Sequence, residues 1–453
     1  MPGGEVQLIV ECPAAVSYRP AIGMRRRRLR RCRTQGNMGA THEEENGMAG
    51  SGRAPGVAVG VLTGCAVICA ALAMGLRQSF GLFLAPMTAA HAWSASGFAL
   101  AIALQVLVNG ITQPIWGQVA DRIGGRRVIM AGALLQLCGV LGMALSEGLP
   151  LFTFFAGVVM GTAVSAAGMP VIMASLTRLL PEAQRGRATG LGTAGSSFGQ
   201  FLVVPLVQFG ITGFGWQAAL VGVALASLLM IPLALPLNDR PPPRAGIAVA
   251  EQSAMEALRL ALRTPTFWYL CCGFFVCGLH VSFLAIHLPG FVASCHLPAA
   301  VGAGAISLIG LFNVAGSLGA GELSSRWKRR ELLVLIYASR GVVMTVFLLA
   351  EKTTASVLVF SAVMGLLWLS TVPPTVALCA RNFGTRWLAT IFGLVFLAHQ
   401  VGGFAGAWLG GVIFDRTGSY DLMWVISILA AAFAALVHMP VRDPAPRPAA
   451  VPA

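Results

Sequence analysis

The chain has 453 residues, of which 56% are hydrophobic and only 11% are charged. This composition excludes an ordinary soluble globular domain. A net charge of +14 would suggest nucleic-acid binding in a soluble protein. Here the positive charges fall in loops between long apolar runs, so we expect a lipid bilayer and no nucleic acid as partner. Ten cysteines lie mostly in apolar segments, at spacings that suit neither a zinc site nor a disulfide framework, so we expect no metal and no cofactor.

Residues 1–56 are polar and lack hydrophobic periodicity, and they contain the basic run 25–31. No apolar segment follows that run closely, which argues against a secretory signal. We predict a disordered cytoplasmic tail that touches anionic lipid. The alternative is an over-long translation start, with Met38 or Met48 as the true first residue.

Twelve apolar runs follow, each long enough to cross a hydrocarbon core of about 30 Å as an α-helix. We therefore predict an all-α integral membrane protein whose 12 transmembrane helices form two pseudo-symmetric six-helix bundles. The predicted spans are 57–86, 94–117, 127–146, 150–176, 187–210, 216–237, 266–292, 299–322, 332–350, 355–379, 387–413 and 420–439.

The distribution of Lys and Arg residues predicts how these spans are oriented in the membrane. Of 31 such residues, 27 lie in the tails and in the loops on one side of the predicted spans. The loops on the other side hold Lys352 and Arg416, and Arg77 and Arg340 lie within spans. Positive charge collects on the cytoplasmic side of membrane proteins. We predict a multi-pass protein of the cell inner (plasma) membrane with both termini cytoplasmic.

The spans divide into two predicted bundles, residues 57–237 and 266–440, followed by a cytoplasmic tail at 441–453. Residues 238–265 are predicted to be a cytoplasmic linker. An amphipathic piece within the linker, residues 255–263, predicts a short helix on the membrane surface.

A shift of about 204 residues lays the first bundle on the second. Repeated halves are typical of transporter folds, which hold their substrate near mid-membrane between the halves. The shift aligns Asn109 with Asn313, Pro86 closely with Pro289, Gly190 with Gly393, and Gly199 with Gly402.

The loop between the second and third spans, residues 117–127, is short and carries four charges. A degenerate copy begins 204 residues later at Gly321, with Ser325 where the first loop has its acid. The two loops resemble the signature loop of the major facilitator superfamily of transporters. The resemblance implies a cytoplasmic gate in which Asp121 pairs with an arginine or a helix N-terminus while the cavity faces outward. The predicted gate residues are Gly117, Asp121, Arg122, Gly124, Arg126, Arg127, Gly321 and Arg326.

Charged side chains within spans are candidates for function, because each costs at least about 2.5–3.5 kcal/mol at a helix centre. Arg77 lies in the first span and Arg340 in the ninth, and no Asp or Glu falls in the middle of a span. Cations without carboxylates should attract an anion, since a carboxylate fits the guanidinium fork. We predict that Arg77 holds a substrate carboxylate. The alternative is that its side chain reaches the outer head groups.

His280 falls at the position that matches Arg77, so the two are predicted to face each other across the pathway. His280 would then be a second donor or a titratable partner. The alternative for His280 is a structural role, in which its ring is hydrogen-bonded within the bundle. Arg340 is a further candidate for substrate contact, or it pairs with Glu322 or a backbone carbonyl.

Four further polar side chains, one histidine, one glutamine and two asparagines, complete the predicted substrate site. His399 and Gln400 lie mid-span in the eleventh helix, where they contact either substrate or another helix. Asn109 and Asn313 are predicted to hydrogen-bond between helices or to reach the substrate. The pair at 373–374 consists of two prolines and must break the tenth helix, which is tolerated where the backbone is buried in protein or faces a cavity.

Beyond the superfamily, five segments resemble bacterial members of the monocarboxylate transporter and oxalate/formate antiporter branch. The resemblance implies secondary transport of a small organic anion by alternating access, either as a proton symporter or in exchange for a counter-anion. We expect a monomer without enzyme activity. The five segments are residues 77–83, 91–94, 370–375, 399–402 and 415–420.

Two departures from that branch concern the coupling. Its members often carry a cation in the eighth span, where this chain has Asn313, and His399 stands where the oxalate exchanger has a lysine. A proton-coupled mechanism would then need a histidine as carrier or co-transport of the neutral acid.

The rival interpretation is proton-driven efflux of drugs or metabolites. Such carriers usually have an arginine in the fourth span and a Gly-Pro motif in the fifth. Here the fourth span has no charge before Gly161 and the fifth has no proline directly after Gly199, which weighs against efflux. An enzyme or a sensor fits poorly, because there is no Ser/His/Asp set and no soluble output domain.

Overall fold

The computed structural model describes residues 59–180, 182–239, 254–384 and 388–444, apart from the side chains of residues 121, 182–189, 254, 257 and 389. The basic tail, most of the linker, the tail beyond residue 444 and the side chain of Asp121 lie outside the described residues. The predictions made for them stay predictions.

The described part of the chain is helical, and it contains twelve helical segments long and apolar enough to cross a membrane. These segments match the twelve predicted spans in order, which confirms an all-α integral membrane fold of two six-helix halves. The first half comprises α1 (Val59–Gln78), η1 (Phe80–Phe83), α2 (Leu84–His91), α3 (Ala95–Ile123), α4 (Gly125–Ala144), α5 (Leu149–Thr153), the π-helix η2 (Phe154–Val159), α6 (Met160–Ala166), α7 (Met169–Leu179), α8 (Glu182–Phe214), α9 (Trp216–Ser227) and α10 (Met230–Ala234). The second half comprises α12 (Pro265–Ser294), α13 (Ala299–Arg326), α14 (Arg329–Leu349), α15 (Thr354–Leu367), α16 (Val372–Phe383), α17 (Leu388–Thr417) and α18 (Asp421–His438).

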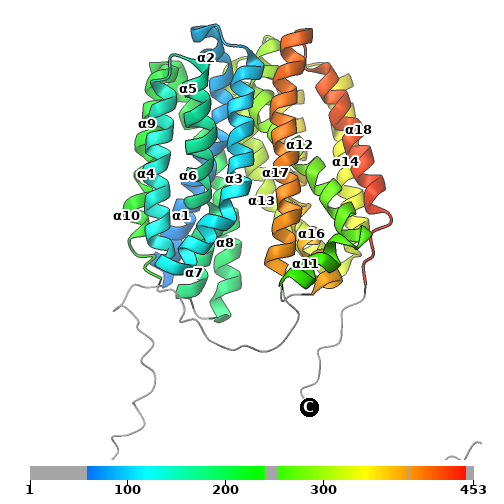
Figure 1. The fold of residues 1–453 in the computed structure, drawn as a ribbon. Helices are drawn as coiled ribbons and strands as arrows, with labels where there is room; N and C mark the ends of the chain where they lie inside the picture. The colour runs from blue at the N-terminus through cyan, green and yellow to red at the C-terminus, as the bar shows by residue number, and fades with distance from the viewer. Residues whose placement is uncertain (1–58, 181, 240–253, 385–387, 445–453) are drawn as a thin grey trace, which may run out of the picture. The chain divides into compact units, whose positions relative to one another are not determined.

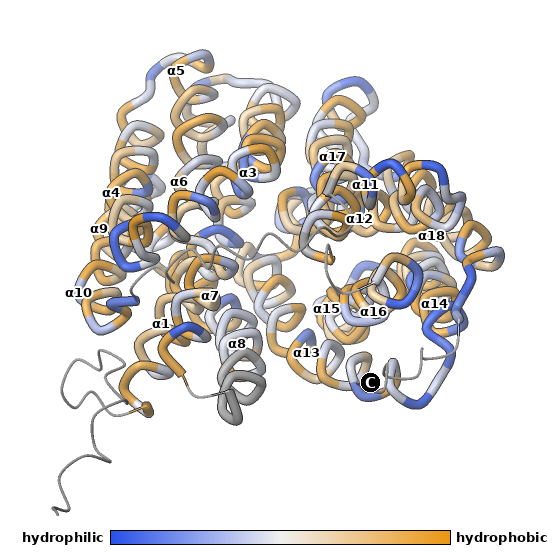
Figure 2. The backbone as a smooth tube through the Cα atoms, turned by 60° about the horizontal axis from the view of Figure 1, so that its bottom comes forward, coloured by the Kyte–Doolittle hydropathy of each residue, from blue (hydrophilic) through white to orange (hydrophobic). Residues whose placement is uncertain are grey.

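The short helix predicted in the linker is present as α11 (Ala254–Leu262). It lies at one end of the bundle, at the bottom of Figure 1, and we call this end the linker end. The opposite end, where α2 and α5 lie, is the far end. In Figure 2 the hydrophilic stretches gather at helix ends and turns, while the helices themselves are mostly hydrophobic. That distribution is expected of helices that face lipid.

The two halves meet along two helix pairs and also where η1 and α2 contact α12. α3 packs along α17, and α8 packs along α13. Because α3 corresponds to α13 and α17 to α8 under the 204-residue shift, the two contacts are related by the pseudo-two-fold symmetry. We call them the α3–α17 seam and the α8–α13 seam.

Within the described residues four spans are interrupted: the first, the fourth, the tenth, and the sixth, which breaks between α9 and α10. The first breaks at Ser79, between α1 and η1, and the tenth breaks between Leu367 and Val372, as its prolines predict. The fourth span also breaks, between α6 and α7, just before Pro170. Pro170 lies 204 residues before Pro374, so the breaks in the fourth and tenth spans occupy matching positions. Interrupted helices at matching positions of two halves mark the substrate site of many transporters.

Candidate functional site

Arg77 lies in the last turn of α1, directly before the break of the first span. The span runs from Val59 to His91, so Arg77 is near its middle, deeper than its sequence-predicted place. The residue is partly buried, and solvent reaches part of it. Within the described residues its guanidinium has no hydrogen-bond or ion-pair partner. A guanidinium at this depth needs a partner, and the five N–H groups are free to bind one.

Arg340 of α14 is fully buried, and its guanidinium is engaged by the protein. It donates to Leu367 O at 2.6 Å, to Trp368 O, and to Cys277 Sγ at 3.7 Å. The two carbonyls belong to the break between α15 and α16, where the helix no longer supplies partners. These contacts match the carbonyl-bound alternative given for Arg340, and they favour a structural role over substrate contact.

His280 of α12 has its hydrogen-bond partner within the second half. Its ring is fully buried, and Nε2 lies 2.9 Å from Ser427 O on α18, within its own half. This contact matches the alternative given for His280, a hydrogen bond within the bundle, and its pairing with Arg77 across the pathway stays a prediction. A buried imidazole held by a backbone carbonyl favours a packing role.

Asn109 and Asn313 do connect helices, as predicted, and they do so in matching ways. Gln400 on α17 donates through Nε2 to Asn109 Oδ1 on α3 at 2.9 Å. On the other seam, Asn313 on α13 donates through Nδ2 to Ser197 Oγ on α8 at 2.9 Å. Both hydrogen bonds join one half to the other, and we call each of them a polar tie. The duplicated sequence thus places one polar tie on each seam near mid-depth.

The asparagine of each polar tie also makes a hydrogen bond to a broken span of its own half. Asn109 donates to Ser165 Oγ of α6 at 3.1 Å, just before the break of the fourth span. Asn313 Oδ1 accepts from the backbone N–H of Leu369 at 3.0 Å, inside the break of the tenth span. The asparagines therefore link the broken helices to the contact between the halves.

His399 and Gln200 extend the polar layer. His399 Nδ1 lies 3.1 Å from Gln400 Oε1, and its ring stacks on Phe396 with 4° between the planes. Gln200 on α8 accepts from Gln78 of α1 at 3.4 Å and donates to Ile306 O of α13 at 2.7 Å. Gln78 follows Arg77 directly, so the candidate anion site lies one residue from a chain of hydrogen bonds that reaches the other half. The sequence analysis did not identify Gln78 or Gln200.

The hydrogen bonds that cross between the halves are unevenly placed along the helices. Within the described residues, they involve only positions 95–109 of α3, 400–415 of α17, 197–200 of α8 and 306–313 of α13. All of these positions lie between mid-depth and the far end. These hydrogen bonds therefore join the described parts of the two halves between mid-depth and the far end.

The predicted gate loops lie at the linker end. Gly124 caps α4 with a φ of +91°, and a Cβ there would stand 2.7 Å from Asp239 O, so only glycine suits this position. Arg326 pairs with Glu322 at 2.6 Å on the exposed surface of α13. Gly117 and Gly321 have nothing within 4 Å of the place a Cβ would take. The gating role of these residues stays a prediction.

Each half has one aspartate at its linker end that binds the start of a helix, and the sequence analysis missed both. Asp239 accepts from Gly125 N, the first residue of α4, at 2.8 Å and from Arg178 Nε at 2.7 Å. Asp443 accepts from Arg329 N, the first residue of α14, at 2.7 Å. It also lies 3.4 Å from Nη1 of an arginine at the end of α16, residue 381. The two acids lie 204 residues apart, and that spacing was the signal that could have revealed them.

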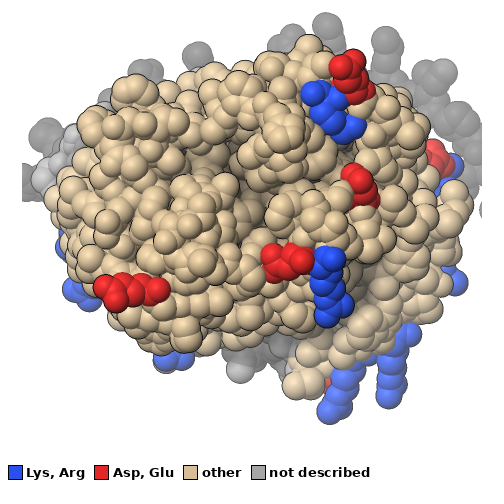
Figure 3. Space-filling view, turned by 90° about the horizontal axis from the view of Figure 1, so that it is seen from above, with Lys and Arg blue, Asp and Glu red and all other residues tan. Residues whose placement is uncertain are grey.

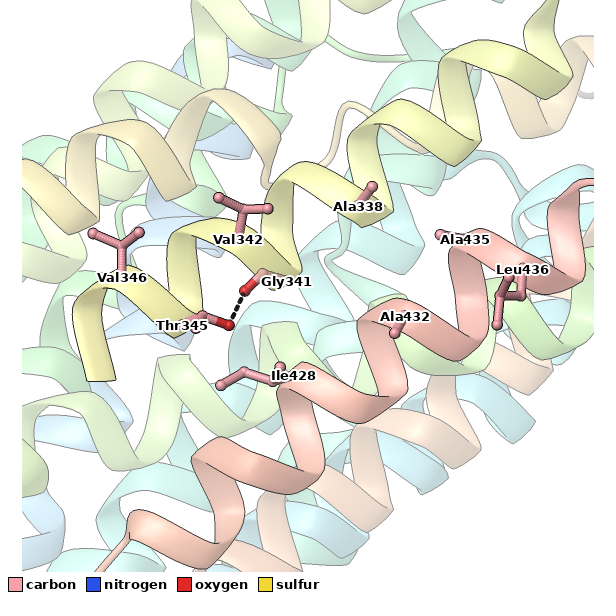
Figure 4. A pocket seen from close by; sticks show the side chains of 9 residues that line it. All are labelled: Ala338, Gly341, Val342, Thr345, Val346, Ile428, Ala432, Ala435 and Leu436. Atoms are coloured by element: carbon pink, nitrogen blue, oxygen red, sulfur yellow. Dashed lines mark hydrogen bonds between the residues drawn. The ribbon is translucent and has the colours of Figure 1, made fainter. Parts of the chain in front are cut away.

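Two open pockets on the surface of the described residues do not suit an anion. One, of about 500 Å³, lies between α14 and α18 and is lined by aliphatic side chains; its only hydroxyl, on Thr345, donates to Gly341 O (Figure 4). The other, of about 730 Å³, is lined by apolar residues of α1, α8 and α13. Neither lining carries a charged side chain.

The far end carries little charge. Figure 3 shows this face covered by side chains, with few Lys, Arg, Asp or Glu residues and only shallow furrows. The layer of side chains agrees with the hydrogen bonds that tie the halves at this end.

Comparison with known proteins assigns the family. A model of the Major Facilitator Superfamily matches residues 66–407. The chain belongs to this superfamily of transporters. It is 26% identical to monocarboxylate transporter 13 of Rattus norvegicus over 378 residues, covering 82% of this chain and 86% of the relative. It is 23% identical to the oxalate:formate antiporter of Oxalobacter formigenes over 386 residues, covering 82% and 90%.

Solved structures support the same fold. A bacterial homologue of the human lysosomal transporter Spinster, in an inward-facing and unoccupied conformation, superposes with a TM-score of 0.66. Its sequence is 14% identical, and the match covers 84% of this chain and 96% of that one. This major facilitator therefore combines an established transporter fold with an arginine, Arg77, that has no hydrogen-bond or ion-pair partner at mid-depth among the described residues.

Proposed function

We propose that the protein is a secondary active transporter that moves a small, monocarboxylate-like organic anion across the membrane by alternating access. Arg77 is the anion anchor. The observation that carries the proposal is the contrast between the two cations within spans: Arg340 is bound by backbone carbonyls, whereas Arg77 has no partner among the described residues. A carboxylate would supply two acceptors to the guanidinium fork.

The relatives support an anion. One relative is named a monocarboxylate transporter and another an oxalate:formate antiporter. The described spans offer no Asp or Glu at mid-depth that could neutralise Arg77 or bind a cationic drug. The transport requires no chemical step and no cofactor, so we assign no enzyme activity.

We place the linker end on the cytoplasmic side of the inner membrane, with both termini on that side, because the Lys and Arg residues collect there. With this orientation the described hydrogen bonds between the halves lie toward the outer end. These bonds favour an inward-facing state, and we infer that the substrate then reaches Arg77 from the cytoplasm. Proton symport and anion exchange are both compatible with the described residues.

Counterflow in proteoliposomes tests the proposal. Vesicles that contain the purified protein are loaded with unlabelled pyruvate, lactate, formate or oxalate, and uptake of the labelled anion is followed at two pH values without a gradient. We expect transient accumulation of at least one monocarboxylate. Accumulation of a drug-like cation such as tetraphenylphosphonium instead, with no anion transported, would overturn the anion assignment in favour of efflux.

A further inference from the structure

Asp415 joins the two halves at the far end of the α3–α17 seam. Its Oδ1 accepts from Ala95 N at 2.9 Å, and its Oδ2 accepts from Ser96 N at 2.8 Å. Asp415 belongs to the last turn of α17, in the second half, and the two N–H groups are the first of α3, in the first half. The sequence analysis noted Asp415 only within a segment of family resemblance and gave it no task.

The carboxylate completes the start of α3. The first N–H groups of a helix have no partner within the helix and need one from outside. Ser94, the N-cap residue, accepts from Gly97 N at 3.0 Å through its side chain. The two N–H groups before Gly97 are left to Asp415. A negative charge at this position is also favoured by the helix dipole.

The backbones are close enough for this contact because of a glycine. A Cβ on Gly411 would stand 2.7 Å from Ser96 Cα and 2.8 Å from Ala95 O. Gly411 precedes Asp415 by about one turn of α17, so the close approach and the hydrogen bonds occur at the same place. The ends of the two helices are therefore held in contact by packing and by charge-assisted hydrogen bonds.

The other seam lacks this device. The residue that matches Asp415 in α8 is Ile211, and α13 begins after Pro298 without a side-chain cap. The neighbouring hydroxyl, on Thr212, donates to Gln208 O of its own helix. Of the described residues, only Asp415 makes hydrogen bonds between the halves at the far end.

We propose that Asp415 is the latch of the outer gate. It holds α3 and α17 together while the outer side is closed and releases the α3 N-terminus when that side opens. Asp415 is exposed to solvent, so water can replace the lost hydrogen bonds on both partners, which makes the contact reversible. The inference rests on the alternating access of the proposed function. It assigns the contact that closes the outer side to one residue, Asp415.

The latch also mirrors the predicted inner gate. α3 and α17 run in opposite directions, so each ends where the other begins. Asp121, near the end of α3, is predicted from the sequence to pair with an arginine or a helix N-terminus at the linker end. The same helix pair would then carry one acid at each end, and each acid would close a different side.

The test measures the distance between the halves at the far end and needs no substrate. Spin labels replace Glu147, in the first half, and Glu351, in the second, both exposed at that end. The native cysteines are first replaced in a background that retains its transport. Pulsed electron–electron resonance then gives the populations with short and long label separations.

We expect Asp415→Ala and Asp415→Asn to raise the ratio of open to closed outer ends about fivefold, the loss typical of a helix cap. Asp415→Glu should lie between these variants and the parent. The matched control is Asp421→Asn, an exposed acid at the start of α18 whose backbone contacts stay within the second half, and it should leave the ratio unchanged.

An unchanged ratio in both Asp415 variants, with two populations visible in the parent, would overturn the latch alone. An equal shift in the Asp421 control would overturn it as well, because the effect would then be one of general surface charge. A single separation in the parent and in every variant would instead contradict alternating access and thus the proposed function.

Discussion

Arg77 and Arg340 are two guanidiniums within the membrane-spanning part of one chain, and their surroundings differ in every respect. Arg340 is fully buried and bound to two carbonyls of a broken helix. Arg77 is reached by solvent and has no partner among the described residues. The comparison shows that depth alone does not identify a substrate residue. A buried cation whose donors are used by the fold stabilises the fold, and one whose donors are free can bind a ligand.

Removing Arg340 should have the largest effect, and the effect should be on stability. In Arg340→Gln the carbonyls of Leu367 and Trp368 lose their donors, and each unsatisfied buried acceptor costs about 1–3 kcal/mol. We expect the free energy of unfolding to fall by roughly 2–6 kcal/mol. Thermal unfolding of the purified protein in detergent measures this. Arg416→Gln, an exposed control, should change stability by less than about 0.5 kcal/mol.

A stable Arg340→Gln protein with weakened anion binding would reverse the two assignments. Arg340 would then be the substrate residue, and the hydrogen bonds to the break would be incidental.

Gln400→Leu should loosen the contact between the halves. The substitution leaves Asn109 Oδ1 without its donor from α17, at a cost of about 1–3 kcal/mol that is paid only while the seam is closed. We expect a shift toward open outer ends, measured with the labels at residues 147 and 351. Gln105→Leu on α3 is the control, because Gln105 is also buried but its Nε2 has no partner within the described residues. Equal behaviour of the two variants would contradict a specific tie between the halves.

Arg77→Lys should weaken the anion site without abolishing it. Lysine keeps the positive charge but loses the planar fork that binds both carboxylate oxygens. We expect affinity for the transported anion to fall about tenfold, corresponding to about 1.4 kcal/mol. Titration of the ligand-dependent unfolding temperature measures the affinity. An affinity equal to that of the parent protein would show that charge alone, and not the fork, holds the substrate.

Asp239→Asn and Asp443→Asn should have the smallest effects. Each acid caps the first residue of a helix in its own half, and loss of such a cap costs about 0.5–2 kcal/mol. Since the acids lie in different halves and share no partner, the double variant should lose the sum of the two single losses. Thermal unfolding of the three variants checks this. A double loss far from the sum would indicate that the halves do not act as separate units.

The twelve spans were predictable from the sequence because length and apolar composition decide membrane insertion. The ties at Asn109 and Asn313 were predictable as well, since an amide within a span requires a partner on a neighbouring helix. The break of the fourth span was not predicted. Its signal was Pro170, placed 204 residues before Pro374, and the duplication would have revealed it.

The direction of His280 could not be predicted. α12 buries residues on nearly all sides, so hydrophobic periodicity does not tell which face meets α18 and which meets the pathway. The partners of Arg340 were equally hidden, because the carbonyls that bind it become free only when the tenth helix breaks. Asp415 shows the same limit. Its partners are backbone N–H groups 320 and 319 residues away, and such groups leave no mark in the sequence.

Counterflow by Arg77→Gln tests the central claim most directly. The variant and the control Arg416→Gln are reconstituted in equal amounts, and uptake of the labelled monocarboxylate transported by the parent protein is compared. The account predicts that Arg77→Gln is as stable as the parent and accumulates no anion, while Arg416→Gln transports normally. Undiminished accumulation by Arg77→Gln, at the same anion concentration dependence, would contradict Arg77 as the anion anchor.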